Sequence, residues 1–75
     1  MGETLWLKVK TFGNDFMMTG LLAMLQRFPG TVGVKVYAAE EKRLVKMHCT
    51  VSIDPELMAK LILLLGEENV KITKK

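Results

Sequence analysis

The residues best suited to catalysis are one histidine, one cysteine and a few carboxylates. His48 and Cys49 are neighbours in a segment where apolar and polar residues alternate. Side chains of neighbouring strand residues point to opposite faces, so these two cannot act together as nucleophile and base. Four acidic residues fall in predicted turns, where solubility explains them: Glu40, Glu41, Glu67 and Glu68. We therefore expect no catalytic residue and no enzyme activity.

Motifs for cofactors and metals are also missing. Gly13 and Gly20 do not form a phosphate-binding loop, because no lysine follows them at the required position. Cys49 is the single cysteine of the sequence, which excludes an internal disulfide and the cysteine spacings of zinc and iron–sulfur sites. We expect no cofactor and no metal, and a reducing cytoplasm is the natural compartment for such a chain.

Aromatic and cationic residues at alternate positions form a further candidate site. Trp6 and Tyr37 offer ring faces to nucleic-acid bases, and lysines on the same face offer positive charge to phosphates. The residues of this candidate are Trp6, Lys8, Lys10, Lys35, Tyr37, Lys46 and His48. The alternative is a solvated face, on which lysines keep an open sheet from aggregating. The glycine–aromatic signature of RNA-recognition domains is absent, which favours the solvated face.

Charge and hydropathy limit the functional classes further. The chain has 75 residues, 49% of them hydrophobic, and a net charge of +3. This charge permits weak attraction to phosphate or to an acidic protein, but it is small for a dedicated nucleic-acid binder. The longest purely apolar runs, such as Leu61–Leu65, are too short to cross a bilayer, and the first ten residues lack the apolar block of a secretory signal. We expect a soluble cytoplasmic protein that does not contact membranes.

The first half of the chain predicts a strand, a helix and a second strand. Apolar and polar residues alternate from Leu5 to Lys10, which indicates a half-buried strand. Asn14 or Asp15 can cap the helix that follows, and this helix is expected to end near Phe28, before a Pro-Gly pair. Alternation resumes from residue 32 to residue 37 and predicts the second strand.

The second half predicts a strand, a helix and a short last strand. Residues 45–53 alternate like the earlier strands. Asp54, Pro55 and Glu56 are an N-cap, a first-turn proline and a first-turn acid, so a helix begins there and runs to Gly66. Residues 70–73 form the last strand.

This element order predicts one α+β domain over residues 1–75. A β-α-β-β-α-β order in which each helix follows a strand is typical of the ferredoxin-like two-layer sandwich. We expect a four-stranded antiparallel sheet in the spatial order 4-1-3-2, with both helices on one face. The aromatic and cationic candidate then lies on the face that the helices leave open.

Both predicted helices are more apolar than a two-layer domain requires. The first carries Phe16, Met17 and Met24 outside its core stripe, and the second is apolar from residue 61 to residue 65. A helix that is apolar on most sides is buried on more than one side. We therefore expect contact with another chain through the helices or a sheet edge, and a homodimer is the simplest form.

Two long segments resemble the ACT domain, a ferredoxin-like module that regulates enzymes of amino-acid metabolism. The first, LKVKTFGNDFMMTGLLAMLQRFPGTVGVKV, has a strand, a short polar loop and an apolar helix. The second, VKMHCTVSIDPELMAKLILLLGEENVKI, is similar to the final strand, helix and strand of that family. The small regulatory subunits of acetohydroxyacid synthase are similar in being short and built from this unit.

The resemblance implies a homodimer that binds a small effector, such as an amino acid, and regulates a catalytic partner subunit. The effector residues that it implies are Phe12, Gly13, Asn14 and Asp15, in the loop between the first strand and the first helix. Backbone amides at a helix N-terminus suit a carboxylate, and Asp15 suits an amino group. Simple helix capping is the alternative role for Asn14 and Asp15. The sequence therefore leaves two functions open: a non-catalytic regulatory or assembly module, or a small protein that binds single-stranded nucleic acid.

Overall fold

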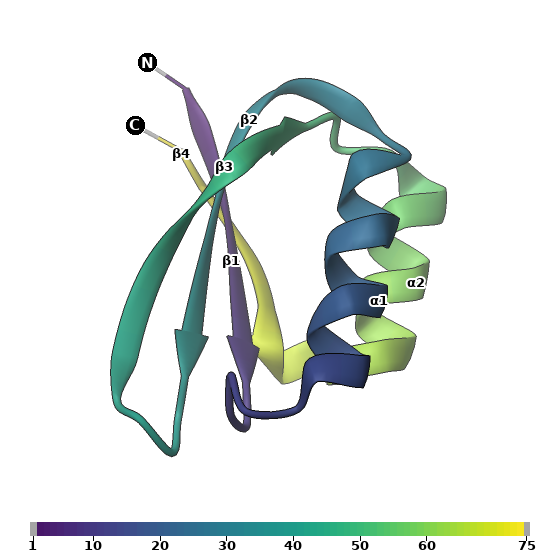
Figure 1. The fold of residues 1–75 in the computed structure, drawn as a ribbon. Coiled ribbons are helices and arrows are strands. Elements are labelled where there is room, and N and C mark those ends of the chain that lie inside the picture. Colours follow the sequence, from purple (N-terminus) through teal and green to yellow (C-terminus); the bar gives the residue numbers. More distant parts are fainter. Residues whose placement is uncertain (1, 75) are drawn as a thin grey trace.

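Four strands form one mixed sheet in the computed structural model, which describes residues 2–74 (Figure 1). The strands are β1 (Glu3–Val9), β2 (Pro29–Ala38), β3 (Arg43–Val51) and β4 (Val70–Lys74). Each begins or ends within a few residues of the alternating segment that predicts it. The α+β class with four strands and two helices is confirmed.

The helices begin where the sequence places their caps. In α1 (Asp15–Gln26) the Asn14 side chain accepts a hydrogen bond from the backbone N–H of Met17 at 3.1 Å. In α2 (Pro55–Leu65) the Asp54 side chain accepts one from the backbone N–H of Glu56 at 2.8 Å. These bonds satisfy N–H groups that have no partner inside the helix. A short 3-10 helix, η1 (Glu67–Asn69), then connects α2 to β4.

The predicted strand order and the predicted antiparallel sheet are both wrong. The order is β3-β2-β1-β4, so β1 lies beside β2 and not beside β3. The β1–β2 pair is parallel, whereas β1–β4 and β2–β3 are antiparallel. The ferredoxin-like arrangement leaves a place between the first two strands for the third. Here the chain returns through α1 so that β2 pairs directly with β1, and β3 lies at the edge of the sheet.

The inner faces of β2 and β3 differ in how completely this order buries them. The inward residues of β2 are small or β-branched and are 0–9% exposed: Val32, Val34, Val36 and Ala38. Those of β3 are Val45, Met47 and Cys49, which are half-buried, and Val51, which is fully buried beside the start of β2. A strand in the centre of a sheet loses more contact with water than an edge strand, so the valines and the alanine of β2 are buried more completely than most inward residues of β3.

Both helices cover one face of the sheet (Figure 1). Leu21 and Leu25 of α1 and Leu57 and Leu61 of α2 are fully buried against the inward residues of the strands. The opposite face carries no helix. We call this second surface the open face, and its residues alternate with the core residues along each strand. They are Thr4, Trp6, Lys8, Gly33, Lys35, Tyr37, Leu44, Lys46, His48, Thr50, Lys71 and Thr73.

The outer surface of the helix layer is partly apolar. Phe16 of α1 is 92% exposed and Leu63 of α2 is 89% exposed. Met17 and Met24, by contrast, are half-buried and pack against the core. Among residues 2–74, no helix is long and apolar enough to span a membrane.

A candidate nucleic-acid interface on the open face

The open face carries positive charge and no carboxylate. Cross-strand pairing aligns Lys46 of β3, Lys35 of β2, Trp6 of β1 and Lys71 of β4 in one row across the whole sheet. Lys35 and Lys46 are directly paired, and like charges in neighbouring strands repel one another. The arrangement is one that an external anion would stabilise.

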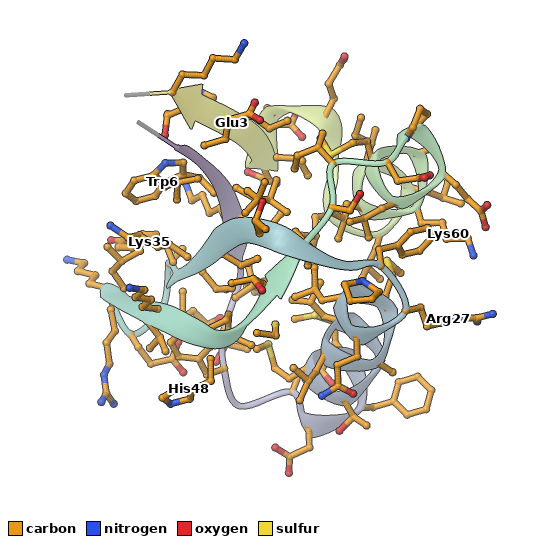
Figure 2. The ribbon with its side chains drawn as sticks, turned by 90° about the horizontal axis from the view of Figure 1, so that it is seen from above. Glu3, Trp6, Arg27, Lys35, His48 and Lys60 are labelled. Carbon is orange, nitrogen blue, oxygen red and sulfur yellow. The ribbon has the colours of Figure 1, made fainter. Side chains whose placement is uncertain are left out.

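Trp6 is held in place at its edge and at its ring. The indole Nε1–H donates a hydrogen bond to the Thr73 hydroxyl oxygen at 2.7 Å. The Lys35 Nζ lies 4.9 Å from the centre of the ring, within the range of a cation–π interaction. Figure 2 shows Trp6 and Lys35 on the side of the sheet away from the helices, whereas Arg27 and Lys60 lie on the helix side. The ring is therefore oriented before any ligand arrives.

A hollow of about 390 Å³ lies beside Trp6, where the open face meets η1. We call it the aromatic hollow. Its lining residues come from β1, β2, η1 and β4, and they are Trp6, Leu7, Lys8, Tyr37, Glu68, Asn69 and Lys71. Both aromatic residues of the open face thus share one hollow with two lysines. Its volume falls in the range of about 300–1,000 Å³ that is typical of small-ligand sites.

Most of the residues predicted for nucleic acid gather here. Trp6, Lys8 and Tyr37 line the aromatic hollow, and Lys35 and Lys46 continue the row toward β3. His48 is exposed on β3 on the same side of the sheet (Figure 2). Lys10 is the exception, because it follows the end of β1 and lines a different cavity.

Four residues of the aromatic hollow are absent from the set that the sequence predicts: Leu7, which belongs to the core face of β1, and Glu68, Asn69 and Lys71. Lys71 lies on the open face by alternation alone, so its position in β4 was a sufficient signal. Glu68 and Asn69 belong to η1 and reach the hollow because β4 pairs with β1. No sequence pattern indicates that contact. Glu68 is the one carboxylate at the hollow and partly offsets the charge of its two lysines.

The predicted effector loop uses several of its polar groups internally. Asn14 caps α1, and the backbone N–H of Gly13 donates to the Thr11 hydroxyl at 3.0 Å. The backbone N–H of Phe12 donates to Glu41 Oε1 at 3.3 Å. Asp15 is exposed at the start of α1. The amides of Phe12 and Gly13 therefore already have partners within the chain.

Glu41 joins this loop to the turn between β2 and β3. The Thr11 hydroxyl donates to Glu41 Oε2 at 2.6 Å. This bond is the main reason that the pKa of Glu41 lies below its ordinary value. Partial desolvation opposes the shift, and the backbone N–H groups of Glu41 and Phe12 add to it. The bonds from Thr11 and Phe12 favour the ionised carboxylate.

A second cavity of about 500 Å³ lies near the effector loop. Asn14 is the only one of the four predicted effector residues among its lining residues. Its walls are mostly apolar, and Lys8 and Lys10 provide positive charge: the other lining residues are Val9, Met17, Ala39, Leu64, Leu65 and Asn69. Such a cavity suits a small carboxylate with an apolar group.

The remaining chemical candidates are separated from one another. His48 is exposed, whereas Cys49 is half-buried and packs against the core. Within the described part of the chain, no three histidine, cysteine or acidic residues gather in a way that could hold a metal ion.

Comparison with known proteins identifies no relative. No protein-family model, no curated protein and no solved structure matches the chain significantly.

Proposed function

We propose that this protein binds single-stranded nucleic acid on the open face of its sheet. The observation that carries this proposal is the aromatic hollow, where Trp6 and Tyr37 lie with Lys8 and Lys71. Stacking of a base on an aromatic ring is worth about 1–3 kcal/mol, and it requires no particular base. Lysines beside the rings would meet the phosphates that flank a stacked base.

The distribution of charge supports the same proposal. The net charge of the whole chain, +3, is small. On the open face, however, no carboxylate of the same strand faces offsets the charge of the lysines. Local potential, and not net charge, sets the attraction of a nearby phosphate, because screening limits interactions to about 8–10 Å at moderate salt. The open face should therefore attract the phosphates of a nucleic acid more strongly than the net charge of the chain indicates.

Trp6 is the only tryptophan, so its fluorescence tests the proposal directly. A mixed-sequence RNA oligonucleotide is titrated into the protein at low salt, and salt is then added. We expect quenching that salt reverses, because phosphate contacts release counterions. Lys71→Gln should reduce the slope of log affinity against log salt by about 0.7, the value of one contact to a single strand.

Lys60→Gln is the matched control for this experiment. Lys60 lies on α2 on the helix side of the molecule, where it pairs with Glu56 at 3.2 Å (Figure 2). Its removal should leave the salt slope unchanged. An unchanged Trp6 signal at low salt, or equal effects of Lys71→Gln and Lys60→Gln, would contradict nucleic-acid binding on the open face.

A regulatory or assembly module, the function that the ACT resemblance implies, is the second candidate. Phe16 and Leu63 favour it, because nearly complete exposure of two large apolar side chains costs free energy that a partner would recover. The apolar cavity beside Asn14 offers a place for an amino-acid effector. The different strand order weakens the resemblance, since the ACT domain is ferredoxin-like.

Sedimentation equilibrium tests this second candidate. A regulatory module should be dimeric at micromolar concentration, and Phe16→Ser with Leu63→Ser should shift it toward the monomer. A monomer at all concentrations, with and without a mixture of amino acids, would contradict it.

A further inference from the structure

We propose that the outer edge of β3 binds an extended peptide in which acidic and apolar residues alternate. The site is separate from the aromatic hollow. The peptide would pair with β3 as a fifth strand of the sheet, a recognised mode of peptide binding in which backbone hydrogen bonds supply affinity and side-chain pockets supply specificity.

The first observation is the position of β3. It is the outermost strand of the order β3-β2-β1-β4, and within the described chain it pairs with β2 alone. Nine residues give it a length of about 30 Å. Backbone groups on its outer side are therefore free for another strand. The opposite edge, β4, is shorter, with only five residues.

The second observation is an apolar groove between β3 and α1. It has a volume of about 370 Å³, and its apolar lining includes Leu22 of α1 together with Val45, Met47 and Cys49 of β3. Leu22 is 37% exposed, so the helix does not seal the inner side of the edge. A strand added beside β3 would lie about 4.8 Å further out, and its inward side chains would enter this groove.

The third observation is the charge on the other side of the same strand. The outward residues of β3 include Lys46 and His48, and β3 contains no acidic residue. Side chains directly opposite each other on paired strands have Cβ atoms about 4.5–5.5 Å apart, so opposite charges attract there. Alternate residues of the peptide that face the open side should therefore be acidic.

A second copy of this chain fits the edge poorly. Antiparallel pairing of two β3 strands would bring the cations of both copies onto one surface, where like charges are destabilising. An acidic strand removes this repulsion.

The test uses a fluorescently labelled octapeptide in which glutamate alternates with valine or leucine, acetylated and amidated at its ends. Binding is measured by fluorescence anisotropy. We expect at least tenfold weaker binding of the same peptide with lysine in place of glutamate, because its charges would face Lys46. Equal binding of the two peptides, or no binding of the acidic peptide at 1 mM, would overturn the proposal.

Backbone pairing is tested with two N-methylated forms of the acidic peptide. One form is methylated at the odd residues and the other at the even residues, so only one loses the N–H groups that face β3. We expect a loss of at least tenfold for one form and less than twofold for the other. Equal losses would mean that the peptide does not bind as a strand, which would also overturn the proposal.

Substitutions then locate the site on the protein. Met47→Glu should weaken binding at least tenfold, because it places a carboxylate in the groove. Leu63→Glu on the exposed side of α2 is the matched control and should change binding less than twofold. Lys71→Gln should also leave peptide binding within twofold, since β4 is the opposite edge. An equal loss for Met47→Glu and Leu63→Glu would contradict a site at β3.

Discussion

Trp6 depends on one hydrogen bond for its position on the open face. The indole N–H donates this bond to the Thr73 hydroxyl. Thr73 belongs to β4, the strand that pairs with the Trp6 strand β1. Lys35 then lies over the oriented ring. A ring that is already ordered loses less conformational entropy when a base stacks on it.

Thr73→Val should loosen the indole and weaken nucleic-acid binding. Valine keeps the shape of threonine but removes the acceptor, at a cost of about 0.5–1.5 kcal/mol in the free energy of unfolding. Steady-state anisotropy of Trp6 should fall in the free protein. The paired residue on β1 provides the control, because Thr4→Val makes the same change directly across from Thr73. Equal effects of the two substitutions would contradict a specific role for the Thr73 hydroxyl.

Two glycines should respond to alanine in opposite directions. A Cβ on Gly30 would overlap the backbone of Val51 and Ser52, where β2 begins beside the end of β3. Gly30→Ala should therefore lower the free energy of unfolding by about 1–3 kcal/mol. Gly20 lies inside α1, and a Cβ there meets no atom within 4 Å. Gly20→Ala should raise stability by about 0.5–1 kcal/mol. Urea denaturation measures the free energy of unfolding of both variants. Destabilisation by Gly20→Ala would contradict the free space around position 20.

Among the secondary-structure elements, the boundaries and two of the three strand pairings were predictable. The predicted order 4-1-3-2 already places β4 beside β1 and β3 beside β2, but it does not place β1 beside β2. Alternation and the caps at Asn14 and Asp54 are local signals, so the strands and helices begin close to the predicted residues. The first helix ends at Gln26, two residues before the predicted Phe28. Strand order is a non-local choice between two ways of placing β2 and β3. Both inner faces are apolar, so alternation alone does not separate the two placements.

The contact between Thr11 and Glu41 ties the loop after β1 to the β2–β3 turn, and it should depend on pH. The pKa of Glu41 is lowered in the folded protein, chiefly by the Thr11 hydroxyl. A lowered pKa in the folded state stabilises the fold above the unfolded-state pKa, and this stabilisation is lost as pH falls through the folded-state pKa. Glu41→Gln should therefore reduce the loss of stability between neutral and acidic pH. Thermal unfolding with Glu40→Gln as the control measures this, and equal pH profiles for the two variants would contradict it.

For the molecule as a whole, the sequence identified most of the candidate surface but not its shape. Trp6, Tyr37 and the lysines were predicted to share one face because alternation is independent of strand order. The aromatic hollow required more, because η1, whose glutamates were predicted only to lie in a turn, lies beside Trp6. Asn69 could not be assigned to this site without the tertiary structure.

The two sheet surfaces that we assign to ligands are compatible in one molecule. The aromatic hollow lies over β1 and β4, and the apolar groove lies at β3. Lys46 belongs to both proposed sites, because it is part of the cross-strand row and also lines the groove at the β3 edge. Lys46→Gln should therefore weaken RNA and acidic-peptide binding together, whereas Lys71→Gln should weaken RNA binding alone. Fluorescence titrations with each ligand compare the two variants.

The central claim, that nucleic acid binds the open face, is tested most directly by two-dimensional ¹H–¹⁵N NMR with a short oligouridylate. Trp6 gives the only indole N–H signal, and that proton is bonded to Thr73. Nucleic-acid binding at the aromatic hollow predicts a concentration-dependent shift of this signal, together with shifts of β1, β2 and β4 that disappear in high salt. Shifts confined to α1 and α2, or an unmoved indole signal at saturating oligonucleotide, would contradict it.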